Sequence, residues 1–229
     1  MKTTLSLLAL LTIASAAVAA PQPIPALPAT ITQPGEYYFV GNMFYNNQAQ
    51  VQSSTTAAAA ITVNAPGGPV VIDMRGFTLT GLEYNATYSI GYLIQSNEVM
   101  IQNGSIDGFL EQITNESTSY FSPVTPVAEI YLLNLFFTKC GEQALQFYNV
   151  NSSTIRNCTF TMVNAGFDGE PGAVIVDQGS ATGNNYVNCK VTGHSFAPTT
   201  QVFAITQATN PNAGLTFSFI ATASPSPDK

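Results

Sequence analysis

The acidic side chains that could hold a cation gather in one short stretch of this 229-residue chain. Asp168 and Glu170 belong to the turn-forming sequence Asp-Gly-Glu-Pro-Gly, and Asp177 follows nearby. Such oxygen ligands suit a hard divalent cation such as calcium, although calcium takes roughly six to eight of them. A solvated turn explains the same residues. We therefore expect no cofactor, and keep a calcium site at Asp168 and Glu170 as the alternative.

Nucleophilic and acid–base chemistry has little support in the sequence. His194 is the single histidine, within Gly-His-Ser, and no motif marks a serine or cysteine as its partner. Cys140, Cys158 and Cys189 are odd in number, so at least one thiol stays unpaired within a monomer. Their spacings match no metal motif, and small buried side chains are the simplest interpretation. We assign no catalytic residue and leave the disulfide state open.

Tyrosines interleaved with Asn, Gln, Thr and Ser favour binding over catalysis. A tyrosine side chain is stiff and amphipathic, which suits contact with a sugar or a protein surface. It is also a good strand former, which is the structural alternative. If side chains alternate along the upstream strand of each repeat, a set of positions there faces outward. These are Thr62, Tyr92, Gln146, Tyr148 and Asp177, of which the last four are the candidate binding residues.

Short strands must position these residues, because the chain has almost no helical periodicity. A pattern recurs in which Asn or Gly lies two residues after an apolar residue, with further apolar residues three and six positions later. A unit of this size cannot bury its apolar face alone, so the pattern predicts a solenoid in which successive coils stack and their strands pair in parallel. The Asn/Gly positions are Gly76, Asn103, Asn134, Asn157 and Gly183.

The Asn/Gly position has a mechanical reason. A turn between two strands needs a residue that tolerates left-handed backbone angles, and Asn and Gly do so. Stacked Asn amides can also hydrogen-bond from coil to coil. We therefore predict a structural ladder of Asn103, Asn134 and Asn157, flanked by Gly76 and Gly183.

Three segments resemble a known family. Residues 31–39 (ITQPGEYYF) look like the opening of many secreted right-handed parallel β-helix proteins, residues 71–79 (VIDMRGFTL) resemble their first full coil, and residues 155–160 (IRNCTF) a later coil. These proteins form the pectate-lyase-like superfamily (pectin lyase fold), and the resemblance covers roughly residues 31–193. It implies an all-β, single-stranded right-handed parallel β-helix of about six coils. Arg75-Gly76 departs from the Asn-Gly that this coil often carries.

The resemblance implies activity on uronic-acid polysaccharides, but the catalytic sets of the superfamily are incomplete. Its lyases hold calcium with several carboxylates on one strand face, and only Asp177 is acidic among the expected outward positions. Its hydrolases need clustered aspartates, a Gly-His-Gly-like turn and an Arg-x-Lys element. The chain offers His194 in Gly-His-Ser and lacks the rest. Whether the protein is an enzyme stays open.

Charge and hydropathy narrow the classes of partner. Six Lys and Arg against thirteen Asp and Glu cannot neutralise a phosphate backbone, so we expect no nucleic-acid partner. Hydrophobic residues make up 45% of the chain, which excludes a disordered protein. No stretch has the length of a membrane-spanning helix, so we expect a protein that does not span the membrane.

The N-terminus has the layout of a secretory signal peptide. Lys2 supplies the charge, Leu5–Ile13 the apolar run, and Val18-Ala19-Ala20 the small residues before a cleavage site. We therefore expect secretion. The predicted organisation is a signal peptide over 1–20, an extended lead-in and N-terminal cap over 21–56, the β-helix domain over 57–220 and a flexible tail over 221–229.

These features predict a secreted β-helix protein that binds an extracellular polysaccharide or surface without catalysis. One alternative is a small carbohydrate-active enzyme of the same superfamily, either a polysaccharide lyase or a glycoside hydrolase. The other is a structural or adhesive surface protein whose rigidity is its function.

Overall fold

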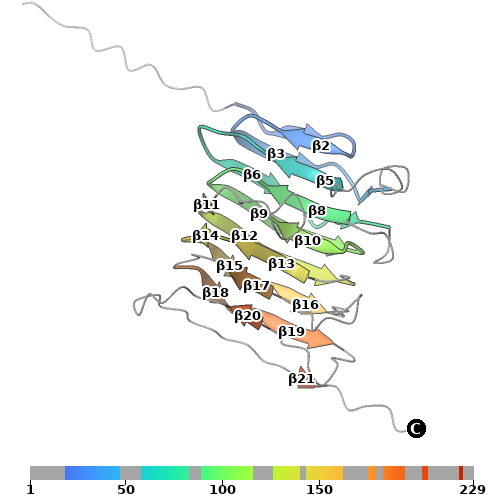
Figure 1. Ribbon diagram of the computed structural model, residues 1–229. Helices are drawn as coiled ribbons and strands as arrows, with labels where there is room; N and C mark the ends of the chain where they lie inside the picture. Colours follow the sequence, from blue (N-terminus) through green and yellow to red (C-terminus); the bar gives the residue numbers. More distant parts are fainter. Residues whose placement is uncertain are drawn as a thin grey trace, which may run out of the picture.

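The described part of the chain is built from β-strands alone. In this computed structural model the described residues form 21 strands and no helix, as expected for an all-β protein (Figure 1). None of them belongs to a helix with the length and apolar character needed to cross a bilayer. The described residues are 19–46, 58–82, 89–115, 126–139, 143–161, 175–178, 183–193, 203–205 and 222–223, with backbone alone at 175–178, 191–193, 203–205 and 222–223.

Two large sheets contain nearly all of these strands. The seven-stranded sheet has the order β2 (Ala29–Ile31), β5 (Ala58–Val63), β8 (Ser89–Ile94), β10 (Glu111–Thr114), β13 (Gln143–Tyr148), β17 (Ile175–Gln178) and β20 (Phe203–Ile205). A small two-stranded sheet pairs β11 (Val127–Ala128) with β14 (Val150–Asn151).

The twelve-stranded sheet follows the order β1-β3-β6-β9-β12-β16-β19-β21, with four further strands beside this path. Its strands are β1 (Gln22–Ile24), β3 (Gly35–Phe39), β4 (Met43–Phe44), β6 (Val70–Asp73), β7 (Thr78–Thr80), β9 (Val99–Asp107), β12 (Ile130–Thr138), β15 (Thr154–Arg156), β16 (Thr159–Thr161), β18 (Asn185–Val187), β19 (Lys190–Gly193) and β21 (Thr222–Ala223).

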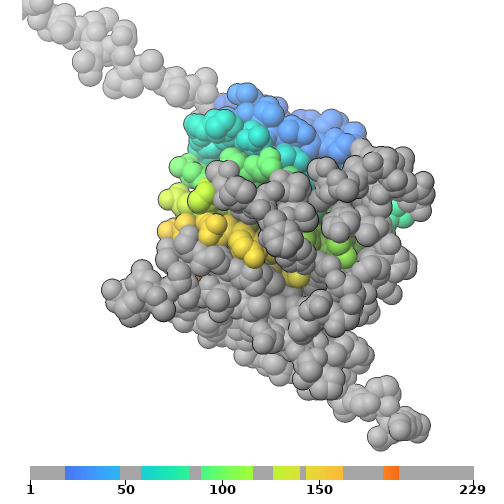
Figure 2. Space-filling view, viewed as in Figure 1, coloured from blue at the N-terminus to red at the C-terminus, as the bar shows by residue number. Residues whose placement is uncertain are grey.

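Every pairing between the described strands is parallel, as the repeat predicted. The chain alternates between the two large sheets, and each strand pairs with its counterpart one repeat later. β9 and β12, for example, pair from Val99↔Ile130 to Asp107↔Thr138. In the space-filling view the repeats lie directly on one another in the order of the sequence (Figure 2).

The core runs as rows of apolar side chains through successive repeats, because parallel pairing in register places equivalent residues above one another. One row contains Ile72, Ile101, Leu132, Ile155 and Tyr186. A second row includes Phe137 and Phe160, whose rings stack with centroids 4.6 Å apart. Stacking therefore buries an apolar face that no single repeat could bury.

Parallel pairing extends beyond the domain boundaries expected from the sequence. β1 pairs with β3, and β4 with β7, inside the segment expected to be an extended lead-in and cap. At the other end β21 pairs with β19, inside the segment expected to be a tail. The predicted signal peptide up to Val18, and the side chains of Cys140 and His194, lie outside the described residues.

Candidate functional site

The structure brings the three predicted ladder asparagines into one hydrogen-bonded line. Asn134 Nδ2 donates to Asn103 Oδ1, and Asn157 Nδ2 donates to Asn134 Oδ1, each at 3.1 Å. All three have left-handed backbone angles, with φ between 54° and 58°. A short polar side chain can sit at such a turn, and the amide both donates and accepts. The line joins three successive repeats along the twelve-stranded sheet.

The upstream end of the ladder is a carboxylate. Asp73 Oδ1 accepts from Asn103 Nδ2 at 3.3 Å and from the backbone N–H of Arg75 at 2.9 Å. Gly76 lies beside the ladder, and its N–H donates to the Asn103 carbonyl at 2.7 Å. The guanidinium of Arg75 lies 3.6 Å from the centre of the Tyr38 ring. Strand β6 ends at Asp73, so Arg75 belongs to the turn that follows this strand.

The expectation that Gly183 flanks the ladder is wrong. Arg156 pairs with Val187 and Thr159 with Lys190, so Asn188 is the residue opposite Asn157, and its φ is 52°. The sequence pattern matched five residues too early because Tyr186 and Cys189 are also apolar. A pattern that matches the structure better is apolar-x-Asn-Cys, which occurs both at 155–158 and at 186–189.

Tyr92 does not face outward as predicted. Its side chain is fully buried in the core, in the row of Ile61, Ile113 and Leu145. The alternation fails because two consecutive residues of this sheet turn inward, so the outward positions shift by one. Ala144 and Leu145 illustrate this, since both are fully buried core residues.

The Tyr92 hydroxyl group is buried inside the protein. Its oxygen has no hydrogen-bond partner among the described residues, and burial raises the pKa of Tyr92 well above its ordinary value. A ligand at the surface cannot reach this group, so Tyr92 is a core residue and not a binding residue.

Gln146 faces away from the core but is not open to solvent. It lies in register with Leu93 and Thr114, and we call these three residues the covered face of the seven-stranded sheet. Leu93 is 7% exposed, Thr114 0% and Gln146 4%. With its NH2 group toward the carboxylate, the Gln146 amide donates to both Glu111 oxygens at 2.9 and 2.8 Å and to Thr114 Oγ1 at 3.2 Å. Gln146 therefore faces away from the core as predicted, but it is too buried to meet a ligand at the surface.

The remaining predicted binding residues do not assemble with Gln146 into a site. Tyr148 is half-buried, and its backbone forms two hydrogen bonds with the Asn115 side chain, at 2.7 and 2.8 Å. Asp177 pairs with Phe147, a core position, and not with Gln146; its side chain lies outside the described residues. Asp168 and Glu170 lie outside them altogether. Within the described ranges, no three His, Cys, Asp or Glu side chains gather as a metal site.

The open surface is on the twelve-stranded sheet, downstream of the ladder. Leu79, Ile106, Phe137 and Phe160 form a fully buried row there. The residues on either side of each of them point outward, because side chains alternate along a strand. We call these outward residues the threonine face: Phe44, Thr78, Thr80, Ser105, Asp107, Phe136, Thr138, Thr159, Thr161 and Lys190.

The threonine face is regular, hydroxyl-rich and nearly uncharged. Its rows repeat every ~4.8 Å across strands and about 6.6 Å along them. Phe136 is 54% exposed near the centre and Phe44 59% exposed at one end. Thr138 Oγ1 donates to Asp107 Oδ1 at 2.8 Å, and Lys190 is the other charged member. Such a surface can donate and accept hydrogen bonds and stack a ring, but it presents no pair of carboxylates for acid–base chemistry.

Sequence reasoning missed this face although a signal existed. Its members lie two and four residues after each ladder asparagine, as in Asn157, Thr159 and Thr161. The Asn134 repeat places Phe136 and Thr138 at the same offsets. The outward positions predicted from the sequence all belong to the upstream strands, so this face was not predicted.

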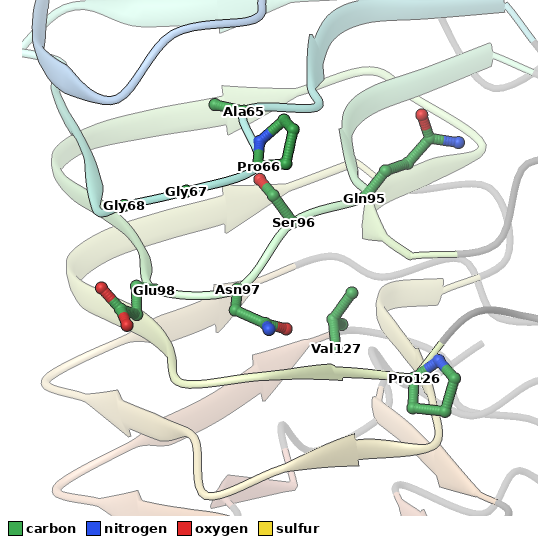
Figure 3. Close-up of a pocket in the computed structure, with 10 residues that line it drawn as sticks. All are labelled: Ala65, Pro66, Gly67, Gly68, Gln95, Ser96, Asn97, Glu98, Pro126 and Val127. Carbon is green, nitrogen blue, oxygen red and sulfur yellow. The ribbon is translucent and has the colours of Figure 1, made fainter.

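A pocket of about 560 Å³ lies between three turns (Figure 3). The turns contribute residues 65–68, 95–98 and 126–127. Asn97 is engaged in the fold, since its Oδ1 accepts from the Ala128 N–H at 2.9 Å. The Ser96 hydroxyl is buried, so it does not present itself to the opening. Glu98 is the one carboxylate of the lining, which makes this a less complete site than the threonine face.

No protein-family model, curated protein or solved structure matches this chain.

Proposed function

We propose that the chain is a secreted right-handed parallel β-helix protein of about six coils that binds a neutral extracellular polysaccharide through its threonine face, without catalysis. The observation that carries this proposal is the regular array of hydroxyls around the exposed ring of Phe136. Secretion rests on the signal-peptide layout of the first twenty residues.

Two features support the β-helix. Each strand pairs in parallel with its counterpart one repeat later, in both large sheets. The amides of Asn103, Asn134 and Asn157 stack at the turn within the twelve-stranded sheet. Both are expected of a solenoid whose successive coils pile up in register. The pectate-lyase-like resemblance adds the right-handed sense and an affinity for polysaccharides.

The chemistry of the face favours a neutral sugar polymer. Sugar hydroxyls exchange hydrogen bonds with threonine hydroxyls, each with a net gain of only about 0.5–1.5 kcal/mol. A polymer that crosses several strands adds such small terms, and an aromatic ring gives the apolar face of a sugar a flat partner. A polyuronate is a poorer match, because Lys190 is the one cation of the face and the chain carries a net charge of −7.

The test is retention of the purified protein on insoluble neutral polysaccharides such as cellulose and chitin, with soluble neutral glucans as competitors. Phe136→Ala should weaken binding at least about tenfold, which corresponds to ~1.4 kcal/mol. Val40→Ala is the matched control, because Val40 is 59% exposed but lies outside the threonine face. Equal loss in both variants, or no retention of the wild type on any neutral polysaccharide, would overturn the proposal.

A further inference from the structure

Two cysteines occupy equivalent positions in successive repeats. Cys158 directly follows Asn157, and Cys189 directly follows Asn188. The register is the same on both sides of them, since Arg156 pairs with Val187 and Thr159 with Lys190. Cys158 is therefore directly opposite Cys189 in the neighbouring repeat.

The two sulfurs point the same way, into the core. Cys158 is 0% exposed and Cys189 3%. Each thiol contacts the carbonyl two residues before it, at 3.4 Å for Cys158 and 3.6 Å for Cys189. Each also contacts a carbonyl of the preceding repeat, that of Leu132 at 3.5 Å and that of Ile155 at 3.4 Å. The two cysteines are thus neighbouring buried side chains, each next in sequence to an asparagine of the turn.

The separation suits a covalent bond. Neighbouring strands lie about 4.7–4.9 Å apart, and the Cα atoms of a disulfide lie about 4.4–6.8 Å apart. A side-chain hydrogen bond to Cys189, together with burial, raises the pKa of Cys158, and the same hydrogen bond lowers the pKa of Cys189. Both thiols are free in this structure.

We propose that Cys158 and Cys189 form a disulfide that joins the repeat of β15 and β16 to the repeat of β18 and β19. The oxidant is a small-molecule disulfide such as oxidised glutathione. The Cys189 thiolate attacks it, forms a mixed disulfide and releases one glutathione thiolate. The Cys158 thiol then loses its proton and attacks the Cys189 sulfur, which releases the second glutathione. Two protein thiols are oxidised and one glutathione disulfide is reduced to two thiols.

The reaction belongs to folding, because the packed repeats bury both sulfurs and exclude the oxidant. The disulfide proposal depends on the proposed function in one respect, because secretion places the protein in an oxidising compartment. The cross-link closes a segment of about 30 residues and restricts the unfolded chain, which stabilises the folded state. It would secure a repeat whose strands β18 and β19 are only three and four residues long.

The test is refolding of the full chain in a glutathione redox buffer and, in parallel, in excess dithiothreitol. Thiols are then alkylated under denaturing conditions and the protein is digested with trypsin and a protease that cleaves before aspartate. Cleavage after Lys139, Arg156 and Lys190 and before Asp168 and Asp177 places the three cysteines on separate peptides. The expected result is a Cys158 peptide linked to the Cys189 peptide, with Cys140 alkylated. Free thiols at both Cys158 and Cys189 after oxidative refolding, or a link from either of them to Cys140, would overturn the proposal.

A second measurement keeps the proposal testable through stability. The Cys140→Ser variant retains only the proposed pair, and its oxidised form should melt about 5–10 °C above its reduced form. The matched control Cys140→Ser/Cys158→Ser cannot form the bond and should show no such shift between the two buffers. Failure of polysaccharide binding would leave both results unchanged, so the two proposals fail separately.

Discussion

The two large sheets each turn a set of side chains away from the core, yet the two sets differ in how far they are exposed. On the covered face Thr114 is fully buried, and Leu93 and Gln146 nearly so. On the threonine face the equivalent outward residues, such as Thr80 and Thr138, are partly exposed. The same residue type therefore stabilises the fold in one place and remains available to a partner in the other.

Direction and exposure are separate properties of a strand residue. Alternation decides only which side of the sheet a side chain takes. Whether that side is open depends on what packs over it, which short-range sequence patterns do not reveal. The proposed binding surface is therefore the outward set that remains open, and not the set richest in tyrosine.

A charge placed on each face should separate the two faces most strongly. Leu93→Lys should lower the free energy of unfolding by about 3–5 kcal/mol, because it places an ammonium group where the side chain is only 7% exposed. Thr80→Lys, opposite Asp107 on the threonine face, should change it by no more than about 0.5 kcal/mol. Urea denaturation measures both values. Similar changes in the free energy of unfolding for the two lysine variants would contradict the distinction between the two faces.

The next effect concerns the ladder that holds the strands of the threonine face in register. Asn134→Ala should cost about 2–3 kcal/mol, because it removes two amide hydrogen bonds and places a Cβ without a polar group at φ 55°. Asn134→Gly relieves the backbone and should cost about 1–2 kcal/mol. The difference between the two variants in urea isolates the backbone part; no loss in either would mean that the ladder contributes nothing to stability.

A smaller effect compares one side-chain hydrogen bond from each face. Gln146→Leu should cost about 2 kcal/mol, because it leaves the Glu111 carboxylate without its amide donor on the covered face. Thr138→Val removes the bond to Asp107 on the threonine face, where water can replace it, and should cost about 0.5 kcal/mol or less. Chemical denaturation at neutral pH gives both numbers, and the reverse order would contradict the assignment of the two faces.

The smallest effect has the opposite sign. Tyr92→Phe should raise the free energy of unfolding by about 1 kcal/mol, because it removes a buried hydroxyl for which the described residues provide no partner. Since burial raises the pKa of Tyr92, above about pH 10 the unfolded chain binds fewer protons than the folded chain. Stability is then lost with rising pH, at up to ~1.4 kcal/mol per pH unit from this group.

The alkaline loss should be shallower in Tyr92→Phe than in the wild type. Denaturation series at pH 8 to about 11.5 would measure the two slopes. Identical slopes, or a less stable variant at neutral pH, would argue that the Tyr92 hydroxyl has a partner after all.

Much of the fold could be predicted because its signal is repeated. The Asn103, Asn134 and Asn157 turns recur with apolar residues at fixed offsets, so one physical argument applied three times. The parallel pairing followed from the size of the unit. Asn188 was missed because an earlier glycine satisfied the same short pattern by chance.

The candidate site was much harder to predict. The direction of Tyr92 was predicted wrongly because two consecutive inward residues interrupt the alternation. Such a change of direction cannot be recognised from the residue types alone. Gly91 is part of that change, since an added Cβ would lie 2.5 Å from the Gln112 carbonyl oxygen and 3.3 Å from Ile106. Gln146 was misjudged for a different reason: its burial depends on packing over the sheet.

The amide ladder has a direction, and this limits how the molecule can grow. Each asparagine gives its proton toward the N-terminus, and Asp73 receives the last one. An ionised carboxylate has no proton to pass on. Duplicating the Asn134 repeat should therefore lengthen the stack without a break, whereas a repeat inserted ahead of Asp73 would meet a carboxylate that can accept a hydrogen bond but cannot donate one. The donor direction of the ladder therefore continues only toward the C-terminus.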